Sequence, residues 1–388
     1  MSSGHTSLRL RYGLNPQQAA AGATTPDGGP LPFSVLAGAP SVLNLLDALQ
    51  GWQLVRAAGD ALGRPAAASI KHVSPAGAAV AGELDAVTRA TFRLEDTTSA
   101  LASAYARARD CDPRSSYGDM VALSEPVDMA TARLLARVVS DGVIAPDYEP
   151  GVLAVLARKK RGAFLVLRMD PAHKPPEQEV RDVFGVRITQ DADPLVLDER
   201  ALGEDVPFSP DVRRDAVLGL IAARHAQSNS VVYVAGGATI GVGTGQQSRV
   251  DCVRLAGEKA DRWRLRRHPL VAATRFPDGG SLQDRVNGVM RLVEGDLTPE
   301  ETAAFAAFPQ PARALDAEEK RDWLPGRTPC TLASDAYLPF RDNVDVAARH
   351  GVRHIVEGGG ARRSADVEAA CAEHGIELVR TGLRLFHH

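Results

Sequence analysis

The sequence predicts an α/β fold in which helical layers cover a sheet. Short apolar segments typical of strands alternate along the chain with longer segments that carry apolar residues at helical spacing. The 388 residues exceed the usual size of one domain, and 44% of them are hydrophobic, an ordinary value for a globular protein. We therefore expect two domains with an ample core.

The overall composition points to a cytoplasmic protein that acts on small molecules. The net charge of −3 offers no general attraction to nucleic acid or membranes. No window approaches the ~18 apolar residues of a spanning helix, and residues 1–7 lack a signal pattern. The four cysteines lie far apart and form no CxxC pair, which favours structural thiols in a reducing compartment and makes a zinc site improbable.

In the first half, strands and helices are expected in alternation. Ser41 is a plausible N-cap for the helix over 41–58. The predicted order is a strand end at 11–13 with a turn at 15–16, a loop over 21–32, the helix over 41–58, a strand ending at 71–72, a helical stretch to about 109, a loop over 112–119, a strand over 120–123, a helix over 131–139 and a strand over 143–145.

Residues 170–210 are rich in Pro, Asp and Glu, and we place the domain boundary there, between 8–200 and 201–388. The second half repeats the α/β pattern, although no sequence repeat proves a duplication. Its predicted elements are a helix over 211–226, paired strands over 229–234 and 240–243, a helix over 249–267, a mostly helical insertion around 270–327, a helix over 341–350, a strand over 352–356, a helix over 364–374 and a last strand over 376–385.

Residues 67–77, AASIKHVSPAG, are the most informative segment. A buried strand of small residues ends at Lys71 and His72, and the Ser74–Gly77 segment is expected to turn the chain. The chain contains only six lysines against 39 arginines, so a lysine here is not background. His72 is the best candidate for a general base, and Lys71 can stabilise a developing oxyanion. The alternative is that the pair is only structural.

Three arginines lie beside turns or strand ends: Arg11, Arg249 and Arg384. They are candidate phosphate ligands, because a guanidinium group makes bidentate hydrogen bonds to phosphoryl oxygens.

The glycine-rich stretch over 236–249 fails the dinucleotide pattern, since its G-x-G-x-G spacing differs from G-x-G-x-x-G. In the segment over 334–343, Asp342 caps the following helix or binds a heterocycle, and Tyr337 can stack on a planar base. From the residues alone, capping is the better interpretation.

Several blocks together resemble one known family. They are RYGLNPQQ at 11–18, SIKHVSPAGAA at 69–79, RSSYGD at 114–119, VSDGVIAP at 139–146, QSNSV at 227–231, GTGQQSR at 243–249, FRDNVD at 340–345 and LRLFHH at 383–388. The chain resembles the AICAR transformylase part of the bifunctional AICAR transformylase/IMP cyclohydrolase family. The resemblance covers residues 8–388 in order.

The resemblance implies transfer of a formyl group from 10-formyltetrahydrofolate to the 5-amino group of AICAR, giving FAICAR in purine synthesis. It also implies two copies of a cytidine-deaminase-like three-layer α/β/α fold without the deaminase zinc. An intertwined homodimer with active sites at the interface is implied, as is a monovalent cation, usually K+. The chain starts where the transformylase begins, so we expect a separate IMP cyclohydrolase.

By position, the resemblance assigns His72 as the proton acceptor and Lys71 as the transition-state stabiliser. It implies AICAR contacts from Arg11, Tyr12, Gly118, Asp141, Asn229, Arg249, Tyr337 and Arg384. It implies folate contacts from Val250, Asp342, Ala361 and Arg362.

The sequence departs from the family pattern at two places that affect substrate preference. Gln17 stands where the family usually has histidine, and the loop over 357–363 is an unfamiliar version of the folate-side loop. The closest alternative is a formyltransferase of the same fold acting on a related amino-imidazole nucleotide. A non-catalytic nucleotide-binding protein and an NAD-dependent oxidoreductase are more distant alternatives.

Overall fold

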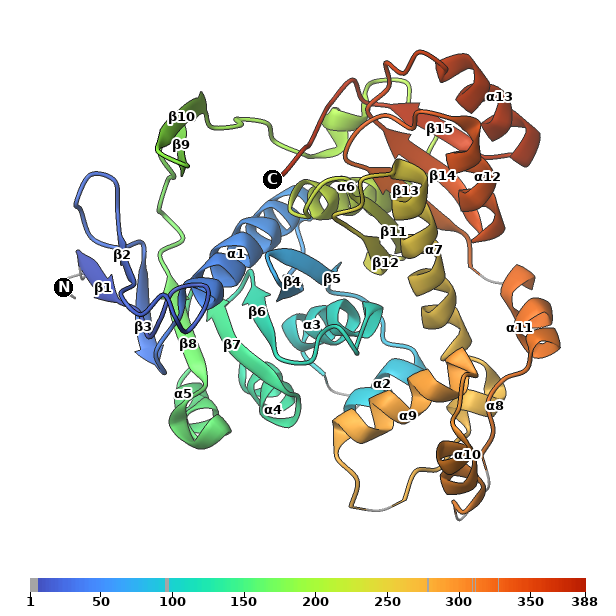
Figure 1. Ribbon diagram of the computed structural model, residues 1–388, viewed down its shortest axis with the longest axis horizontal. Coiled ribbons are helices and arrows are strands. Elements are labelled where there is room, and N and C mark those ends of the chain that lie inside the picture. The colour runs from blue at the N-terminus through green and yellow to red at the C-terminus, as the bar shows by residue number, and fades with distance from the viewer. Residues whose placement is uncertain (1–5, 95–97, 278, 309, 311, 327) are drawn as a thin grey trace.

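The computed structural model describes residues 6–388 except 95–97, 278, 309, 311 and 327 (Figure 1). Eleven strands form one central sheet in the order β15-β14-β13-β11-β12-β5-β4-β6-β7-β8-β3. Their bounds are β3 Phe33–Ala37, β4 Ala66–Lys71, β5 Ser74–Val80, β6 Asp119–Leu123, β7 Ser140–Ala145, β8 Leu165–Met169, β11 Val231–Ala235, β12 Ala238–Gly243, β13 Cys330–Ser334, β14 Val352–Glu357 and β15 Glu377–Arg380. The mixed sheet with its covering helices confirms the α/β class.

The helices confirm most of the sequence-based expectations to within a few residues. Ser41 caps α1 as predicted and shares a capping box with Asn44. The main helices are α1 Val42–Leu62, α2 Ala86–Phe92, α3 Ala100–Cys111, α4 Met129–Arg137, α5 Val152–Leu156, α6 Pro210–Arg224, α7 Arg249–Leu265, α12 Arg341–Arg349 and α13 Ser364–His374. The expected insertion contains α8 Pro269–Ala272, α9 Leu282–Glu294, α10 Pro299–Ala306 and α11 Ala317–Trp323.

Both halves of the sheet have the same strand order. A hairpin (β4–β5 or β11–β12) lies next to a strand that runs antiparallel to it (β6 or β13), and two further strands continue in parallel (β7 and β8, or β14 and β15). The halves meet where Ala238 of β12 pairs with Ala79 of β5. One sheet therefore crosses residue 200, and the division into two domains there stays a prediction.

Helices cover both faces of this sheet. Alternate residues of β4 show the arrangement: Ala68 and Ile70 belong to the core beneath α1 and α6, whereas Ala67 belongs to the core beneath α3 and α4. A third core joins the second half of the sheet to α7, α12 and α13. The three layers leave the ends of the strands at the edge of the molecule, where the candidate site lies.

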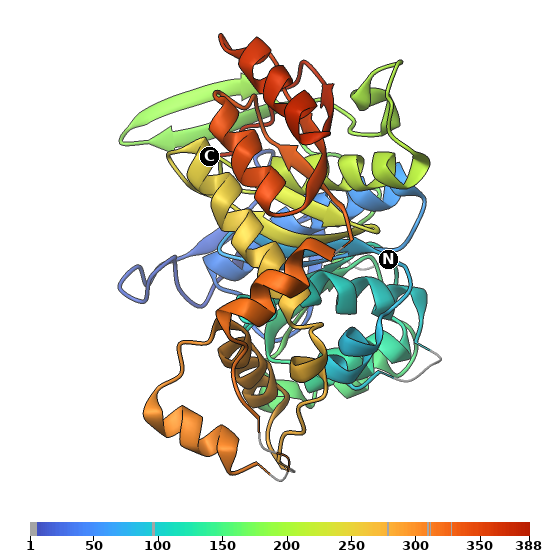
Figure 2. The same cartoon turned by 90° about the vertical axis from the view of Figure 1, so that its right-hand side faces the viewer.

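Several strand predictions were wrong in extent. The segment over 170–210 holds a two-stranded ribbon, β9 Gln178–Val183 and β10 Val186–Asp191, that stands away from the sheet (Figure 2). The first of the paired strands begins at Val231 rather than 229, and the last strand ends at Arg380 rather than 385. A small ribbon of β1 Ser7–Arg9 and β2 Gly22–Thr24 precedes the sheet, so part of the expected loop over 21–32 is a strand.

Candidate functional site

Lys71 and His72 lie at the tip of the β4–β5 hairpin. The two residues between the strands are His72 and Val73, whose φ angles of 54° and 60° are in the left-handed region. The prediction that Ser74–Gly77 forms the turn was wrong, because Ser74 already begins β5. Gly77 instead allows close packing, since a Cβ there would lie 2.1 Å from the carbonyl oxygen of Ala108 in α3.

The Lys71 ammonium group is held against the loop before β6. Its Nζ donates hydrogen bonds of 3.0 Å to the carbonyl oxygens of Tyr117 and Gly118. Gly118 has a φ of 73°, and a Cβ on it would lie 3.2 Å from Lys71 Nζ and 3.7 Å from a carboxylate oxygen of Asp141. The structure therefore brings together Lys71, Gly118 and Asp141, three of the predicted site residues.

Asp141 forms an ion pair with Lys160 in the short 3₁₀ segment Lys159–Gly162. Sequence reasoning missed Lys160, although the pair of adjacent lysines in a lysine-poor chain was an available signal. The neighbouring Lys159 donates to the Ser140 hydroxyl and to the carbonyl oxygen of Leu135. Burial lowers the pKa of Lys159 to about 7. Lys160 is therefore the side chain that forms an ion pair with Asp141, and Lys159 binds the residue before it in β7.

A buried carboxylate that sequence reasoning also missed holds the tip of the hairpin. Val73 N–H donates a 2.6 Å hydrogen bond to Asp47 Oδ1 in the second turn of α1. Burial raises the pKa of Asp47, while the Val73 amide and the charges of His72 and Lys71 lower it. No sequence signal marked Asp47, because the helix over 41–58 also carries Asn44, Gln50, Gln53 and Arg56.

Arg11 and Tyr12 lie at the N-terminal end of α1. The Arg11 guanidinium donates a 3.3 Å hydrogen bond to the Tyr12 hydroxyl and lies 5.2 Å from the ring centroid. The Tyr12 carbonyl oxygen accepts a hydrogen bond from Val42, the first residue of α1. Because Asp47 lies on the same helix one turn further on, this end of α1 connects the arginine–tyrosine pair to the hairpin tip.

A second group of predicted residues forms around Arg249, which begins α7. Arg249 makes an ion pair with the buried Asp335 and donates a 2.7 Å hydrogen bond to Asn229 Oδ1. Asp335, which sequence reasoning did not assign to the site, also accepts hydrogen bonds from Ser228 Oγ at 2.7 Å and Ser230 N at 3.0 Å. Since the Arg249 guanidinium is already paired inside the protein, a phosphate contact from it stays a prediction.

The C-terminal segment lies along this second group. Leu385 N donates a 2.7 Å hydrogen bond to the Asp335 carbonyl oxygen, and His387 N donates one of 3.0 Å to Ser228 Oγ. Arg384 is exposed, with its guanidinium 5.3 Å from the Phe386 ring centroid. Tyr337 is 46% exposed. Both side chains are therefore accessible to a ligand from solvent.

The predicted folate contacts lie on α7, α12 and the loop before α13. Val250 follows Arg249 in α7, which packs against α12. The interpretation that Asp342 caps α12 was wrong, because the N-cap is Phe340 and Asp342 lies in the first turn, exposed. Ala361 accepts a hydrogen bond from Ser364 N, and Arg362 is exposed. The folate role of these four residues stays a prediction.

One hydrogen bond joins the two groups: Gln227 N donates to Ser74 Oγ at 3.2 Å, so the hairpin tip touches the chain that leads to Asn229.

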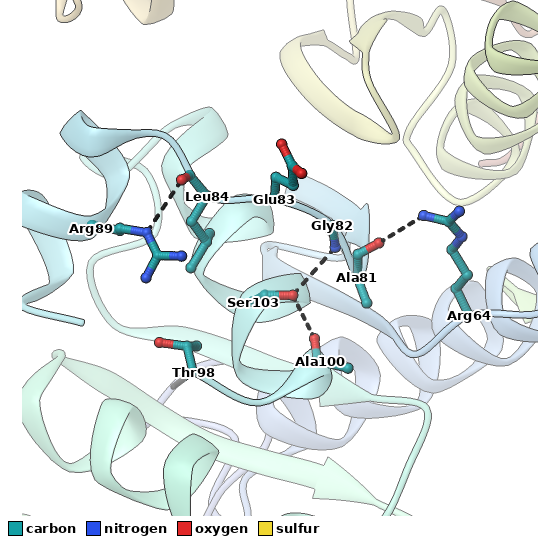
Figure 3. A pocket seen from close by; sticks show the side chains of 9 residues that line it. All are labelled: Arg64, Ala81, Gly82, Glu83, Leu84, Arg89, Thr98, Ala100 and Ser103. Atoms are coloured by element: carbon teal, nitrogen blue, oxygen red, sulfur yellow. Dashed lines mark hydrogen bonds between the residues drawn. The ribbon is translucent and has the colours of Figure 1, made fainter. Parts of the chain in front are cut away.

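A separate pocket of about 400 Å³ lies at the opposite end of β5, where Arg64 and Arg89 stand on its two sides (Figure 3). None of the predicted site residues lines that pocket. The candidate site is therefore the exposed hairpin tip with its neighbours.

Fold and site together define an α/β protein that presents an adjacent lysine and histidine on a hairpin turn, beside Gly118 and Asp141. The family model described as AICARFT/IMPCHase bienzyme matches residues 1–259. The chain belongs to this family, which confirms the resemblance seen in the sequence.

Whole-chain relatives agree with the family model. The chain is similar to the bifunctional purine biosynthesis protein PurH of Magnetococcus marinus, with 31% identity over 98% of this chain and 59% of that protein. It is similar to the proteins of the same name from Cereibacter sphaeroides and Jannaschia sp., with 30% identity over 100% of this chain and 60% of each relative. The chain thus spans about 60% of the length of these relatives.

Proposed function

We propose that this chain is a formyltransferase that moves the formyl group of 10-formyltetrahydrofolate to the 5-amino group of AICAR, giving FAICAR in purine biosynthesis. The observation that carries the proposal is the Lys71–His72 pair at the tip of a left-handed turn, with the lysine held beside Gly118 and Asp141. Family membership and the purine biosynthesis relatives support it. The related amino-imidazole acceptor is not favoured by these relatives.

The pair suits the chemistry of amide formation. The AICAR amine is conjugated to an electron-poor ring, so it needs a base as its nitrogen attacks the formyl carbon. Neutral His72 accepts the amine proton while the new C–N bond forms, and the formyl oxygen gains negative charge. The bond from the formyl carbon to N10 then breaks, and the proton passes to N10 as tetrahydrofolate leaves.

Lys71 is arranged to stabilise that oxygen. A lysine ammonium group has three N–H donors. Two of them are used by the carbonyl oxygens of Tyr117 and Gly118. No residue in the described part of the chain accepts the third, so one donor of a fixed cation is available for the developing oxyanion.

The remaining site residues are proposed as substrate contacts. The proposed AICAR contacts are Arg11, Tyr12, Gly118, Asp141, Asn229, Arg249, Tyr337 and Arg384. The proposed folate contacts are Val250, Asp342, Ala361 and Arg362. The acidic Asp141 suits the ribose hydroxyl groups, and the arginines suit the phosphate.

The proposal extends to the assembly and fold family that the resemblance implies. The repeated strand order supports two cytidine-deaminase-like units, and a homodimer is proposed with them. No helix in the described part of the chain could cross a membrane. Within that part, no three His, Cys, Asp or Glu side chains gather as metal ligands, and K+ binding stays a prediction.

Purified protein mixed with AICAR and 10-formyltetrahydrofolate tests the proposal, because release of tetrahydrofolate can be followed by absorbance. We expect turnover, and we expect His72→Ala to lower kcat by about 100-fold or more, since a positioned base contributes that much. His173 is exposed and far from the hairpin in sequence, so His173→Ala is the matched control and should retain wild-type turnover. Absence of turnover by the wild type, or full turnover by His72→Ala, would contradict the proposal.

A further inference from the structure

The hairpin tip that carries Lys71 and His72 has a structural counterpart in the second half of the chain. The β4–β5 turn consists of His72 and Val73, and the β11–β12 turn consists of Gly236 and Gly237. All four residues have φ between 54° and 79°, so both turns use the left-handed region at both positions. The two hairpins also occupy equivalent places in their halves of the sheet.

An aspartate from the preceding helix holds each turn. Asp47 is the sixth residue of α1, and Asp215 is the sixth residue of α6. Asp47 Oδ1 accepts a 2.6 Å hydrogen bond from Val73 N. Asp215 accepts hydrogen bonds of 2.8 Å and 2.5 Å from the two glycines of its turn. Both aspartates are buried, at 6% and 7% exposure, so each is placed to bind backbone rather than solvent.

The first turn has histidine and valine where the second has two glycines, so the first turn depends more on its aspartate. Glycine adopts the left-handed region at no steric cost, so the Gly236–Gly237 turn carries no steric strain. Histidine and the β-branched valine are disfavoured there, and such a conformation persists only when its surroundings impose it. The turn that bears the proposed base is therefore the one that depends on its aspartate.

We propose that Asp47 is a positioning residue: by binding the Val73 amide, it holds the His72–Val73 turn in the left-handed conformation that sets the direction of the His72 and Lys71 side chains. The part of this inference that concerns catalysis rests on the formyltransferase activity proposed above. The part that concerns the turn stands on the two hairpins alone.

The first test compares formyl transfer by Asp47→Ala, Asp47→Asn and Asp215→Ala. A misplacement of about 1 Å can cost on the order of 100-fold, so we expect Asp47→Ala to lower kcat by about that factor while the KM for AICAR changes little. Asp47→Asn keeps an oxygen acceptor for the Val73 amide and should stay within about threefold of wild type. Asp215→Ala removes the same kind of anchor from the glycine turn and serves as the control, also within about threefold.

Equal kcat values for Asp47→Ala and Asp215→Ala would overturn the inference, as would an Asp47→Ala defect confined to KM. Should Asp47→Ala fail to fold, Asp47→Glu replaces it. The longer side chain pushes the turn outward, so kcat should fall about tenfold or more, and wild-type kcat for this variant would overturn the inference.

The second test needs no activity and therefore separates this inference from the proposed function. Amide hydrogen exchange at Val73 should be about tenfold faster in Asp47→Ala, or in Asp47→Glu if the first variant does not fold, because the amide loses its native acceptor. Exchange at Gly237 should be unchanged in the Asp47 variants and faster in Asp215→Ala. Unchanged Val73 exchange would overturn the inference even if the wild type proves active.

Discussion

His72 and Val73 occupy a backbone region that ordinary side chains avoid. The equivalent turn in the second half of the chain has glycine at both positions. The first turn therefore keeps its side chains at a cost in backbone energy, as is common where a functional side chain must be presented in one direction. The strain and the proposed base lie in the same two residues.

Relieving this strain should stabilise the protein. A left-handed non-glycine residue costs about 1–3 kcal/mol, whereas glycine costs about 0.5–1 kcal/mol through its greater freedom in the unfolded chain. We expect Val73→Gly to raise the free energy of unfolding by about 1 kcal/mol, measured by urea denaturation.

The reverse substitution, made in the other turn, is the control for that experiment. Gly236→Ala places a side chain in the left-handed region of the other turn, where nothing lies closer than 3.9 Å to the new Cβ. It should lower the free energy of unfolding by about 1 kcal/mol. A loss of stability in Val73→Gly would show that the first turn is not strained.

Among individual residues, sequence reasoning found those whose chemistry is unusual for their setting. Lys71 and His72 were recognisable because they are adjacent, follow a strand and include a rare lysine. Asp47 was not recognisable, because its partner is a backbone amide 26 positions further along the chain. Asp335 was missed because its role comes from a buried contact with Arg249 that only the fold creates.

Between elements, the Arg249–Asp335 ion pair ties the start of α7 to the end of β13. Both side chains are almost fully buried, at 6% and 0% exposure. Removing one partner of a buried pair leaves an uncompensated charge in the interior. This pair therefore holds the second half of the site in place.

We expect Asp335→Ala to lower the free energy of unfolding by about 3–5 kcal/mol. The control is Asp60→Ala, which breaks the exposed Arg56–Asp60 pair on α1 and should cost about 0–1 kcal/mol. Both are measured by chemical denaturation. Similar losses for the two variants would mean that the Arg249 charge is satisfied in another way.

Elements with a clear hydrophobic period and a cap were predictable, as α1 shows with its Ser41 capping box. β5 was not, because Ser74-Pro75-Ala76-Gly77 has the composition of a turn. Two contacts override that local preference: β5 pairs with β4 along its length, and α3 packs so closely on Gly77 that only glycine fits. Tertiary packing decided the structure there.

Across the whole molecule, the two halves are joined by strand pairing and by a buried polar contact. Gln50 of α1 donates to the carbonyl oxygen of His225, which ends α6, and its amide nitrogen lies 3.3 Å from ring nitrogens of both His225 and His387. Burial lowers the pKa of His225 to about 3 and also lowers that of His387. The folded protein therefore requires a neutral His225.

This requirement makes stability fall in acid. The pKa of His225 is lower in the folded chain than its ordinary value of 6.5, so its contribution is fully present above pH 6.5 and is lost as the pH falls from 6.5 toward 3. Between pH 7 and pH 4, the wild type should lose about 3 kcal/mol more than His225→Gln.

Denaturation curves at several pH values measure this difference. His173→Gln, at an exposed histidine, is the control and should follow the wild type. If His225→Gln loses stability in acid as steeply as the wild type, His225 is not the group that titrates.

The arrangement of the halves could be predicted only in part. Alternating elements predicted α/β layers, and the family resemblance implied a repeated unit. The join itself was not visible in the sequence. It includes the buried Arg266–Asp110 ion pair, which only the fold creates, and one antiparallel strand pair, Ala79 with Ala238, between residues 159 positions apart. Small residues of this kind carry no pairing signal of their own.

The most direct test of the central claim is a crystal structure of the protein with AICAR bound. We expect the 5-amino nitrogen within about 2.6–3.2 Å of a His72 ring nitrogen, with Lys71 Nζ facing the place where the formyl oxygen must lie. AICAR bound away from the hairpin tip, or a His72 ring directed away from the amine, would contradict it.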